Sequence, residues 1–353
     1  MASPSTVRPL AELTSIQVGG TPAEIYVAKT RDDLVEHVLN VWRSGDDWLV
    51  LGGGSNMVVA DEVEELRVIK VENLGIEPVR NKDETRVVVR VQAGEDWDAF
   101  VAHTVKAGLA GIEAMSGIPG TVGAAPVQNI GAYGQELSDS MVRLEFVDYE
   151  THEIAILEAK DLQFGYRDSA IKRGRPGGIT WVEFELQKLD GLSRPLYSTQ
   201  IAADLGVEMG AQVPLEDVRQ SVLKLRARKG MVLDAKDPDS VSCGSFFTNP
   251  IVTDKVARAL PDDAPKYESE EDEGLTVKLS AAWLIENAGI EKGFQIAGSG
   301  AAISSKHTLA IVNKGGATAQ EILQLAEYVQ VRVSNKFGIN LQPEPNLIGF
   351  AKH

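Results

Sequence analysis

Two side chains that could do covalent chemistry lie in the stretch SCGSFFTNP, residues 242–250. Cys243 is the single cysteine of the chain, and Ser245 follows it two positions later, between Gly244 and Phe246. A thiol is the stronger nucleophile, but nucleophilic catalysis needs a base within hydrogen-bond reach, usually a histidine. The five histidines fall in no recognisable nucleophile pattern. These residue types alone leave the choice between Cys243 and Ser245 open.

Two charged side chains stand in surroundings that suit a binding role. Arg167 follows an aromatic pair in FGYRDSAIK and could present a fork of donors to a carboxylate or phosphate. Glu344 lies between Pro343 and Pro345, which limit backbone freedom and suit a carboxyl group held at a fixed angle. Each has an ordinary interpretation as well: an isolated arginine is more often a surface or salt-bridge residue, and Glu344 could be an exposed glutamate in a turn.

Two glycine-rich segments could hold a ligand against the backbone. LGGGSN, residues 51–56, follows an apolar strand and could turn its N–H groups toward an anion, although its spacing matches neither a P-loop nor the Rossmann fingerprint. GIPGTVGAAPVQNIGAYG, residues 117–134, is too apolar for a linker, and the amides of Gln128 and Asn129 could reach ring or ribose edges. A tight turn and a buried irregular loop are the alternatives. Together the two segments favour a shared dinucleotide cofactor.

Composition narrows the class of protein. The chain has 353 residues, which favours two or three domains, and its formal charge of −16 argues against nucleic acid or an anionic membrane as partner. One cysteine cannot form an intramolecular disulfide, and no segment has the length and apolarity of a signal peptide or membrane span. We therefore expect a soluble cytoplasmic protein.

Local patterns predict the elements that must position these residues. Helices are expected at 31–44, capped by Thr30 and Gly45, at 97–108 and 215–230, and after the capping box that begins at Thr318. Strands are expected on both sides of the first glycine loop and in RVVVRVQA, RLEFVDY, EIAILE and TWVEFEL, the last half-buried with alternating polar residues. The stretches 190–200 and 206–214 predict a linker region, and the acidic run 262–273 predicts a solvated loop inserted at the surface. This pattern predicts an α+β class.

Read jointly, the motifs resemble the UDP-N-acetylenolpyruvoylglucosamine reductase family. LGGGSN, GIPGTVGAAPVQNIGAYG, FGYRDS, GSFFTNP, SAAWLIENAGIEKG with GAAISSKHTLAIVN, and LQPEPNLIG occur in one order over nearly the whole chain. The resemblance implies a three-domain α+β flavoprotein, with two N-terminal subdomains forming a vanillyl-alcohol-oxidase-type FAD-binding unit and a C-terminal substrate-binding domain. The expected ranges are 1–75, 76–215 and 216–338, followed by a segment 339–353 that carries Glu344.

The resemblance also implies a reaction. NADPH would reduce FAD, and flavin N5 would pass hydride to the terminal CH₂ carbon of the enolpyruvyl ether of UDP-N-acetylglucosamine, giving UDP-N-acetylmuramate for peptidoglycan synthesis. Arg167 would neutralise the charge that develops on the substrate carboxylate, and Glu344 would donate a hydrogen bond in its protonated form. Ser245 matches the family's proton donor, so the resemblance selects Ser245 over Cys243. Lys229 would stabilise the serine alkoxide.

Further site residues follow from matching positions. Tyr133, Tyr197 and Asn249 match substrate contacts, although the residues after Tyr197 depart from the commoner family pattern. The expected cofactor-binding residues are Leu51, Gly52, Gly53, Gly54, Ser55, Asn56, Gly117, Ile118, Pro119, Gly120, Gly123, Ala124, Gln128, Asn129, Gly131, Ala132 and Tyr133. No metal is expected, and the small-molecule substrate is expected to bind a monomer.

Two rival functions remain open from the sequence. The first is an FAD-dependent oxidase of the same fold; many of these tether flavin through a histidine, which neither glycine loop contains. The second is a non-catalytic nucleotide-binding protein, which would be expected to have lost Arg167, Ser245 or Glu344, whereas all three are present. The site residues therefore favour the reductase.

Overall fold

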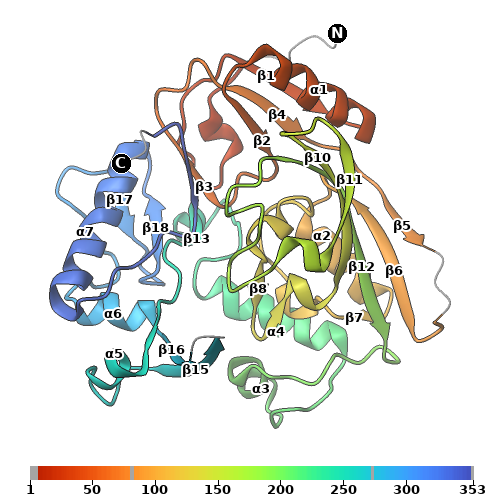
Figure 1. Cartoon of the computed structure of the whole chain (residues 1–353). Helices are drawn as coiled ribbons and strands as arrows, with labels where there is room; N and C mark the ends of the chain where they lie inside the picture. The colour runs from red at the N-terminus through yellow and green to blue at the C-terminus, as the bar shows by residue number, and fades with distance from the viewer. Residues whose placement is uncertain (1–6, 80–82, 272–273, 351–353) are drawn as a thin grey trace. The chain divides into compact units, whose positions relative to one another are not determined.

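The computed structural model describes residues 7–79, 83–271 and 274–350 (Figure 1). Its contacts divide the chain into two compact units. Of the described residues, unit 1 comprises 7–8, 21–54, 63–79 and 83–228, and unit 2 comprises 9–20, 55–62, 229–271 and 274–350. The chain thus passes from one unit to the other inside the first glycine loop, after Gly54.

Unit 1 begins with a parallel sheet in the order β1-β4-β2. Helix α1 (Arg31–Ser44) packs against it and has both predicted caps, the Thr30 capping box and Gly45 in the left-handed conformation (Figure 1). The carboxyl end of β2 leads directly into the first glycine loop. The strands are β1 (Glu24–Ala28), β2 (Trp48–Leu51) and β4 (Arg67–Val71).

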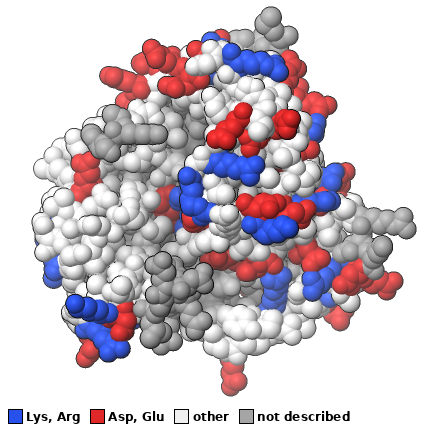
Figure 2. Space-filling model, viewed as in Figure 1, with Lys and Arg blue, Asp and Glu red and all other residues white. Residues whose placement is uncertain are grey.

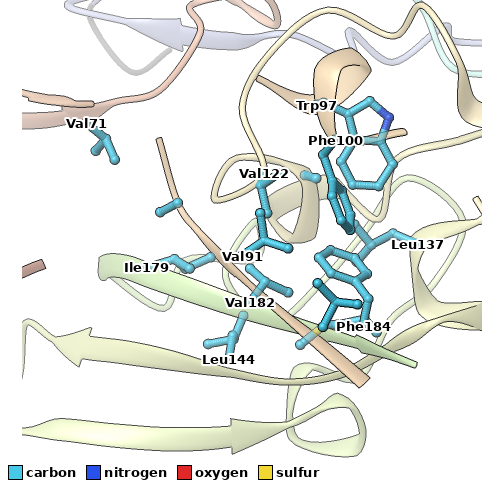
Figure 3. Packing of buried hydrophobic residues seen from close by; sticks show 14 of the residues in the cluster. Val71, Val91, Trp97, Phe100, Val122, Leu137, Leu144, Ile179, Val182 and Phe184 are labelled. Carbon is cyan, nitrogen blue, oxygen red and sulfur yellow. The ribbon is translucent and has the colours of Figure 1, made fainter. Parts of the chain in front are cut away.

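A second, antiparallel sheet of unit 1 carries the larger core. Its order is β11-β10-β12-β6-β5, and β7 also pairs with β12. Trp97 and Phe100 of helix α2 pack ring against ring with each other and with Phe184 of β12, with centroids 5.1–6.0 Å apart (Figure 3). The elements are α2 (Trp97–Lys106), β5 (Ile76–Val79), β6 (Arg86–Gln92), β7 (Leu109–Ala110), β10 (Met141–Asp148), β11 (Ile154–Glu158) and β12 (Gly177–Lys188).

The expectation that β12 exposes one polar face is wrong at Glu183. This carboxylate is 1% exposed because two arginines on the neighbouring strands satisfy it, Arg90 of β6 at 2.7 Å and Arg143 of β10 at 2.7 Å. Burial alone would raise the pKa of Glu183, but the hydrogen bonds from Arg143 and Arg90 outweigh burial and lower it. A paired carboxylate can therefore occupy a position that the alternating pattern assigns to solvent.

Two helices complete unit 1. The region expected to be linker, around residues 190–214, contains α3 (Thr199–Leu205), which Ser198 caps by accepting the N–H of Ile201. Ile201 packs with Val218 and Val222 of α4 (Leu215–Ala227) in a small apolar cluster. Helix α4 was expected at the start of the third domain and lies in unit 1; the three-domain division stays a prediction.

The described residues of unit 2 form three small sheets. Their orders are β13-β18-β17, β14-β16-β15 and the parallel pair β19-β3. Helix α7 (Ala319–Phe337) begins at the predicted Thr318 capping box and buries Ile322, Ala326 and Val329. The other elements are β3 (Met57–Val59), β13 (Ser242–Ser245), β14 (Ile251–Thr253), α5 (Asp254–Arg258), β15 (Lys266–Glu271), β16 (Gly274–Leu279), α6 (Ala281–Asn287), β17 (Ala301–Ile303), β18 (Ala310–Asn313) and β19 (Asn346–Ile348).

The prediction of a solvated loop over the acidic run 262–273 is also wrong for most of its described residues. Residues 266–271 form β15, paired antiparallel with β16, while Asp272 and Glu273 lie outside the described residues. Ladder hydrogen bonds to β16 override the low strand propensity of glutamate. The predicted α+β class is confirmed.

Charged side chains of both signs are scattered over the visible face, between broad areas of other residues. Figure 2 shows acidic and basic groups interspersed there, without one large patch of a single sign. The net charge of −16 is therefore not gathered into one visible acidic surface. Among the described residues, no helix is long and apolar enough to cross a bilayer.

Candidate functional site

In unit 1 the two glycine-rich segments pack backbone against backbone. A Cβ added to Gly53 would come within 2.6 Å of the Gly120 Cα, and one added to Gly52 would lie 3.2 Å from the Ala124 Cβ and collide with the Thr121 hydroxyl. A side chain larger than hydrogen at Gly53 would require the backbone at Gly120 to move, and one at Gly52 would require the Thr121 side chain to move. The structure therefore brings together segments that are about 65 residues apart, as a shared ligand would require.

Backbone hydrogen bonds hold the second glycine segment in place. The Trp97 N–H at the start of α2 donates to the Gly120 carbonyl at 3.0 Å, and the Gly123 N–H donates to the Ala93 carbonyl at 2.9 Å. A Cβ on Gly123 would lie 2.5 Å from that of Ala93. Tight packing against α2 and the end of β6 makes this loop a preformed surface.

The Thr121 side chain stands out within this surface. It is 9% exposed, and its hydroxyl has no hydrogen-bond partner among the described residues. Buried hydroxyl groups are nearly always satisfied, so an unsatisfied one indicates a missing partner such as a ligand or water. Sequence analysis did not select Thr121, because a threonine between Gly120 and Val122 has no distinguishing pattern.

Asn129 is held by the protein itself. Its amide nitrogen donates to Glu136 and to the Gly165 carbonyl, both at 3.0 Å, and its amide oxygen accepts the Ser138 N–H at 3.0 Å. Both donors and one acceptor lone pair are thus engaged. The expected contact between Asn129 and a cofactor stays a prediction, and its observed role is to fix the loop.

Arg167 lies against the second glycine segment. Its guanidinium donates to the carbonyls of Asn129, at 3.3 Å, and Gly131, and is 3.9 Å from Glu136. The side chain is 17% exposed. The backbone of Arg167 has φ 54°, and Asn129 and Tyr133 have φ 46° and 51°. Non-glycine residues in this left-handed region cost about 1 kcal/mol each and cluster at functional sites.

A second arginine at this loop escaped the sequence analysis. Arg226, near the end of α4, donates from Nε to the Gly117 carbonyl at 3.2 Å. Burial lowers the pKa of Arg226 to about 10, against the opposing influence of Tyr133 and Asp98, so the guanidinium stays charged at neutral pH. Burial also raises the pKa of Tyr133, which the positive charge of Arg226 opposes.

Arg219 lies on the same face of helix α4 as Arg226. It lies two turns before Arg226 and binds Asp98 of α2 at 2.6 and 2.8 Å, while Asp98 also accepts the Gly117 N–H at 2.6 Å. Burial by itself would raise the pKa of Asp98, but these hydrogen bonds and the charge of Arg219 lower it. The i, i+7 spacing of the two arginines is the sequence signal that was missed.

Tyr197 is near the end of the second glycine segment but extends into solvent. Its side chain is 71% exposed, and its Cβ is 3.5 Å from the position that a Cβ on Gly134 would take. The exposed ring precedes Ser198, the N-cap of α3. Unit 1 thus brings the two glycine segments, Arg167 and Tyr197 into one neighbourhood.

In unit 2 the strand that carries Ser245 lies beside the segment that carries Glu344. The Glu344 N–H donates to the Phe246 carbonyl at 2.9 Å, and Phe247 forms a β-bridge with Pro343. Asn56 joins the same segment, donating from its side chain to the Glu344 carbonyl at 3.3 Å. Residues 56, 245 and 344 are therefore neighbours in unit 2.

Asn249 and Lys229 occupy different surroundings in unit 2. The Asn249 side-chain oxygen accepts the Ala281 N–H at 3.0 Å and so holds the start of α6. Lys229 is close enough to His307 to act on its charge: burial, with Lys229 and Lys292, lowers the pKa of His307 to about 4. His307 is therefore neutral at pH 7, and protonating it below its usual pKa would oppose folding.

The surroundings of Cys243 make its thiol unreactive. Its thiol is buried and donates to the Met57 carbonyl at 3.2 Å, and burial raises the pKa of Cys243 to about 12. The thiolate, which is the reactive form, is therefore scarce at neutral pH. Among the described residues, no group of three or more His, Cys, Asp or Glu side chains could hold a metal ion.

We expect Cys243→Ala to keep steady-state turnover within about twofold, and native Cys243 to react with a thiol reagent far more slowly than in urea. The measurement is the labelling rate in native and unfolded protein beside the activity of the variant. Rapid native labelling accompanied by loss of turnover would mean that the thiol, not the serine, does the chemistry.

Comparisons with known proteins agree with the division of the chain. Residues 22–156 match a family model described as FAD binding domain, and residues 237–348 match one described as UDP-N-acetylenolpyruvoylglucosamine reductase, C-terminal domain. Proteins of that name from Leifsonia xyli subsp. xyli and Thermobifida fusca are 50% and 47% identical, over 96% and 97% of this chain and 98% and 97% of theirs. The crystal structure of the reductase from Thermus caldophilus has a TM-score of 0.64 at 26% identity, covering 97% of this chain and 98% of that one.

Proposed function

Because the chain belongs to the UDP-N-acetylenolpyruvoylglucosamine reductase family, we propose that it reduces UDP-N-acetylglucosamine enolpyruvate to UDP-N-acetylmuramate with NADPH, as a step of peptidoglycan precursor synthesis. The observation that carries the proposal is the hydrogen bond between the Glu344 N–H and the Phe246 carbonyl, 2.9 Å long. This backbone bond joins the segment that carries Glu344 to the residue after Ser245, about 100 residues earlier in the chain, and it supports the proposal that both side chains serve one site.

FAD is the cofactor, and the residues of unit 1 fit it. Gly52 and Gly53 lie so close to residues 120–124 that an added Cβ would collide with them, so the two loops present one closely packed backbone surface, and the Thr121 hydroxyl has no protein partner in the described chain. When bound, FAD supplies the hydride carrier between NADPH and the enolpyruvyl CH₂ carbon. The glycine segments would hold its diphosphate and ring through backbone groups, and the complete cofactor-binding set remains a proposal.

Arg167 would bind the substrate carboxylate. Hydride addition to the CH₂ carbon drives electrons onto that carboxylate, so negative charge grows there during the reaction. A donor positioned to meet this growing negative charge lowers the activation free energy by ~3 kcal/mol. The bonds from Arg167 to the Asn129 and Gly131 carbonyls support this role, because they hold the guanidinium on the loop before substrate arrives.

Ser245 would deliver the proton to the carbanionic carbon, and Lys229 would stabilise the alkoxide that remains. A hydroxyl is a weak acid, but an enolate carbon is a strong base, so a well-placed hydroxyl suffices. Tyr133, Tyr197 and Asn249 would contact the substrate.

Glu344 would donate a hydrogen bond to the developing charge in its protonated form. We expect turnover of the wild-type protein to fall on the alkaline side as this acid ionises, and Glu344→Gln, which keeps an N–H donor but cannot ionise, to lose that alkaline limb. The measurement is kcat and kcat/KM against pH for both proteins. A flat wild-type profile that the substitution leaves unchanged would remove the acid role.

Cell location and assembly belong to the same proposal. We place the chain in the cytoplasm as a monomer, with roles in cell-wall formation, cell shape and cell division that follow from making a peptidoglycan precursor. The net charge of −16 supports a small-molecule substrate over a nucleic acid.

The proposed function is tested by following NADPH oxidation by the purified protein with and without the enolpyruvyl sugar. Oxidation that requires the sugar is the expected result. Rapid oxidation with oxygen alone would indicate an oxidase, and a bound flavin that NADPH never reduces would indicate a non-catalytic protein.

A further inference from the structure

Lys70 is a half-buried lysine at the mouth of the first glycine loop. It lies on β4, the central strand of the parallel sheet, and pairs in register with Leu51, the last residue of β2. Its ammonium donates a hydrogen bond to the Gly52 carbonyl. Ligands of parallel α/β sheets bind beyond the carboxyl ends of the strands, which is where this lysine lies.

Structural needs do not account for this lysine. Among the described residues no carboxylate is within ion-pair distance of its ammonium, and lysines are rarely buried without such a partner. Burial lowers the pKa of Lys70, Arg8 adds to that effect and Glu72 opposes it. An apolar residue on this central strand would be more stable than a lysine that is only partly compensated.

The contact with Gly52 has a geometric consequence for the loop. In a trans peptide the C=O and the next N–H point in opposite directions, so holding the Gly52 carbonyl on Lys70 turns the Gly53 N–H away from the sheet lysine. Within the described chain, no hydrogen bond has the Gly53 or Gly54 N–H as its donor. Successive N–H groups in a glycine loop form a concave site for an anion.

The Thr121 hydroxyl provides an independent sign of a ligand at the same place. It lies against Gly52, is buried, and has no partner among the described residues. A lysine-held carbonyl, two available N–H groups and an unsatisfied hydroxyl thus meet around residues 52–54.

We propose that Lys70 is a positioning residue of the cofactor site, fixing the Gly52 carbonyl so that the loop presents its N–H groups to the diphosphate of FAD. The inference rests on the proposed assignment of the glycine segments to FAD. The positive charge of Lys70 would also attract the FAD diphosphate, and the Thr121 hydroxyl would donate a hydrogen bond beside the loop.

The test is FAD affinity, measured by fluorescence titration of the full-length chain after its flavin has been removed. Lys70→Met is expected to raise the Kd for FAD at least tenfold and to flatten its salt dependence, with the apoprotein Tm within a few degrees of wild type. Lys188→Met, at an exposed strand end, removes the same charge elsewhere and is expected to leave the Kd unchanged.

Two further variants keep the outcomes separable. Gly53→Ala must weaken FAD binding if the loops hold the cofactor, whatever Lys70 does. A normal Kd for Lys70→Met beside a weakened Gly53→Ala would overturn the role of Lys70 alone, and normal values for both would overturn the cofactor assignment itself. If Lys70→Met does not fold, Lys70→Arg is tested in its place. The bulkier guanidinium should raise the Kd for FAD at least threefold, and an unchanged Kd would contradict the proposal.

Thr121→Val tests the hydroxyl separately. Removing an unsatisfied buried hydroxyl is expected to raise the Tm of the apoprotein, and removing a ligand donor is expected to raise the Kd for FAD at least threefold. A raised Tm with an unchanged Kd would show that the hydroxyl does not face the cofactor, and would remove the second support for the proposal.

Discussion

Ser245→Ala is expected to abolish turnover of the enolpyruvyl sugar while NADPH still reduces the bound flavin at the wild-type rate. General acid catalysis by a positioned group contributes roughly 10²–10⁴-fold, so the loss of kcat should be at least of that order. Flavin reduction does not require a proton from the serine, which is why the two half-reactions should separate. Stopped-flow absorbance of the flavin, first with NADPH and then with the sugar, measures both.

The neighbouring residue provides the control for this variant. Cys243→Ala changes the same strand, β13, two positions away, and is expected to leave both half-reactions intact. Equal losses in the two variants would indicate damage to the strand and not to a proton donor. A Ser245→Ala protein that turns over the sugar at more than a tenth of the wild-type rate would exclude Ser245 as the acid.

Gly53→Ala is expected to disturb the contact between the two glycine segments strongly, although it adds a single methyl group. Its Cβ would lie 2.6 Å from the Gly120 Cα and 3.0 Å from the Gly120 carbonyl carbon, and backbone atoms cannot rotate away as a side chain can. Overpacking of this kind costs about 1–3 kcal/mol. Because the same approach of the two loops shapes the proposed FAD site, the purified variant should retain under about a tenth of the wild-type flavin.

Gly178→Ala is the matched control. Gly178 also belongs to unit 1, but the atoms nearest to an added Cβ are 3.6 and 3.9 Å away and belong to side chains, and its φ does not require glycine. The free energy of unfolding and the flavin content of this variant should stay near wild type. If Gly53→Ala binds flavin as tightly as Gly178→Ala, the contact between the loops is not part of the cofactor site.

The backbone strain at Arg167, Asn129 and Tyr133 supports the same neighbourhood. All three have positive φ, and all three lie in or against the second glycine segment. A chain retains such conformations where the surrounding contacts over-determine them, and here Arg167 is tied to the carbonyls of residues 129 and 131. The strain is consistent with a loop shaped to bind a ligand.

Local sequence determined the helix caps, the family and the candidate site residues of this protein. The caps of α1 and α7 are set by Thr30, Gly45 and Thr318, and they appear in the structure as predicted because capping depends on residues three or four positions apart. The motifs identified the family, and they supplied Arg167, Ser245 and Glu344 as candidates. These features need no knowledge of distant contacts.

Tertiary structure alone decided which groups meet. Glu344 pairs with Phe246, Arg226 binds the Gly117 carbonyl, and Lys70 binds the Gly52 carbonyl, each through a contact between segments that are far apart in the chain or on separate elements. It also decided that Glu183 is buried, because its two arginines come from other strands. Periodicity reports which face of an element is apolar, but the hydrogen-bond partner of a buried polar group is fixed only when the chain has folded.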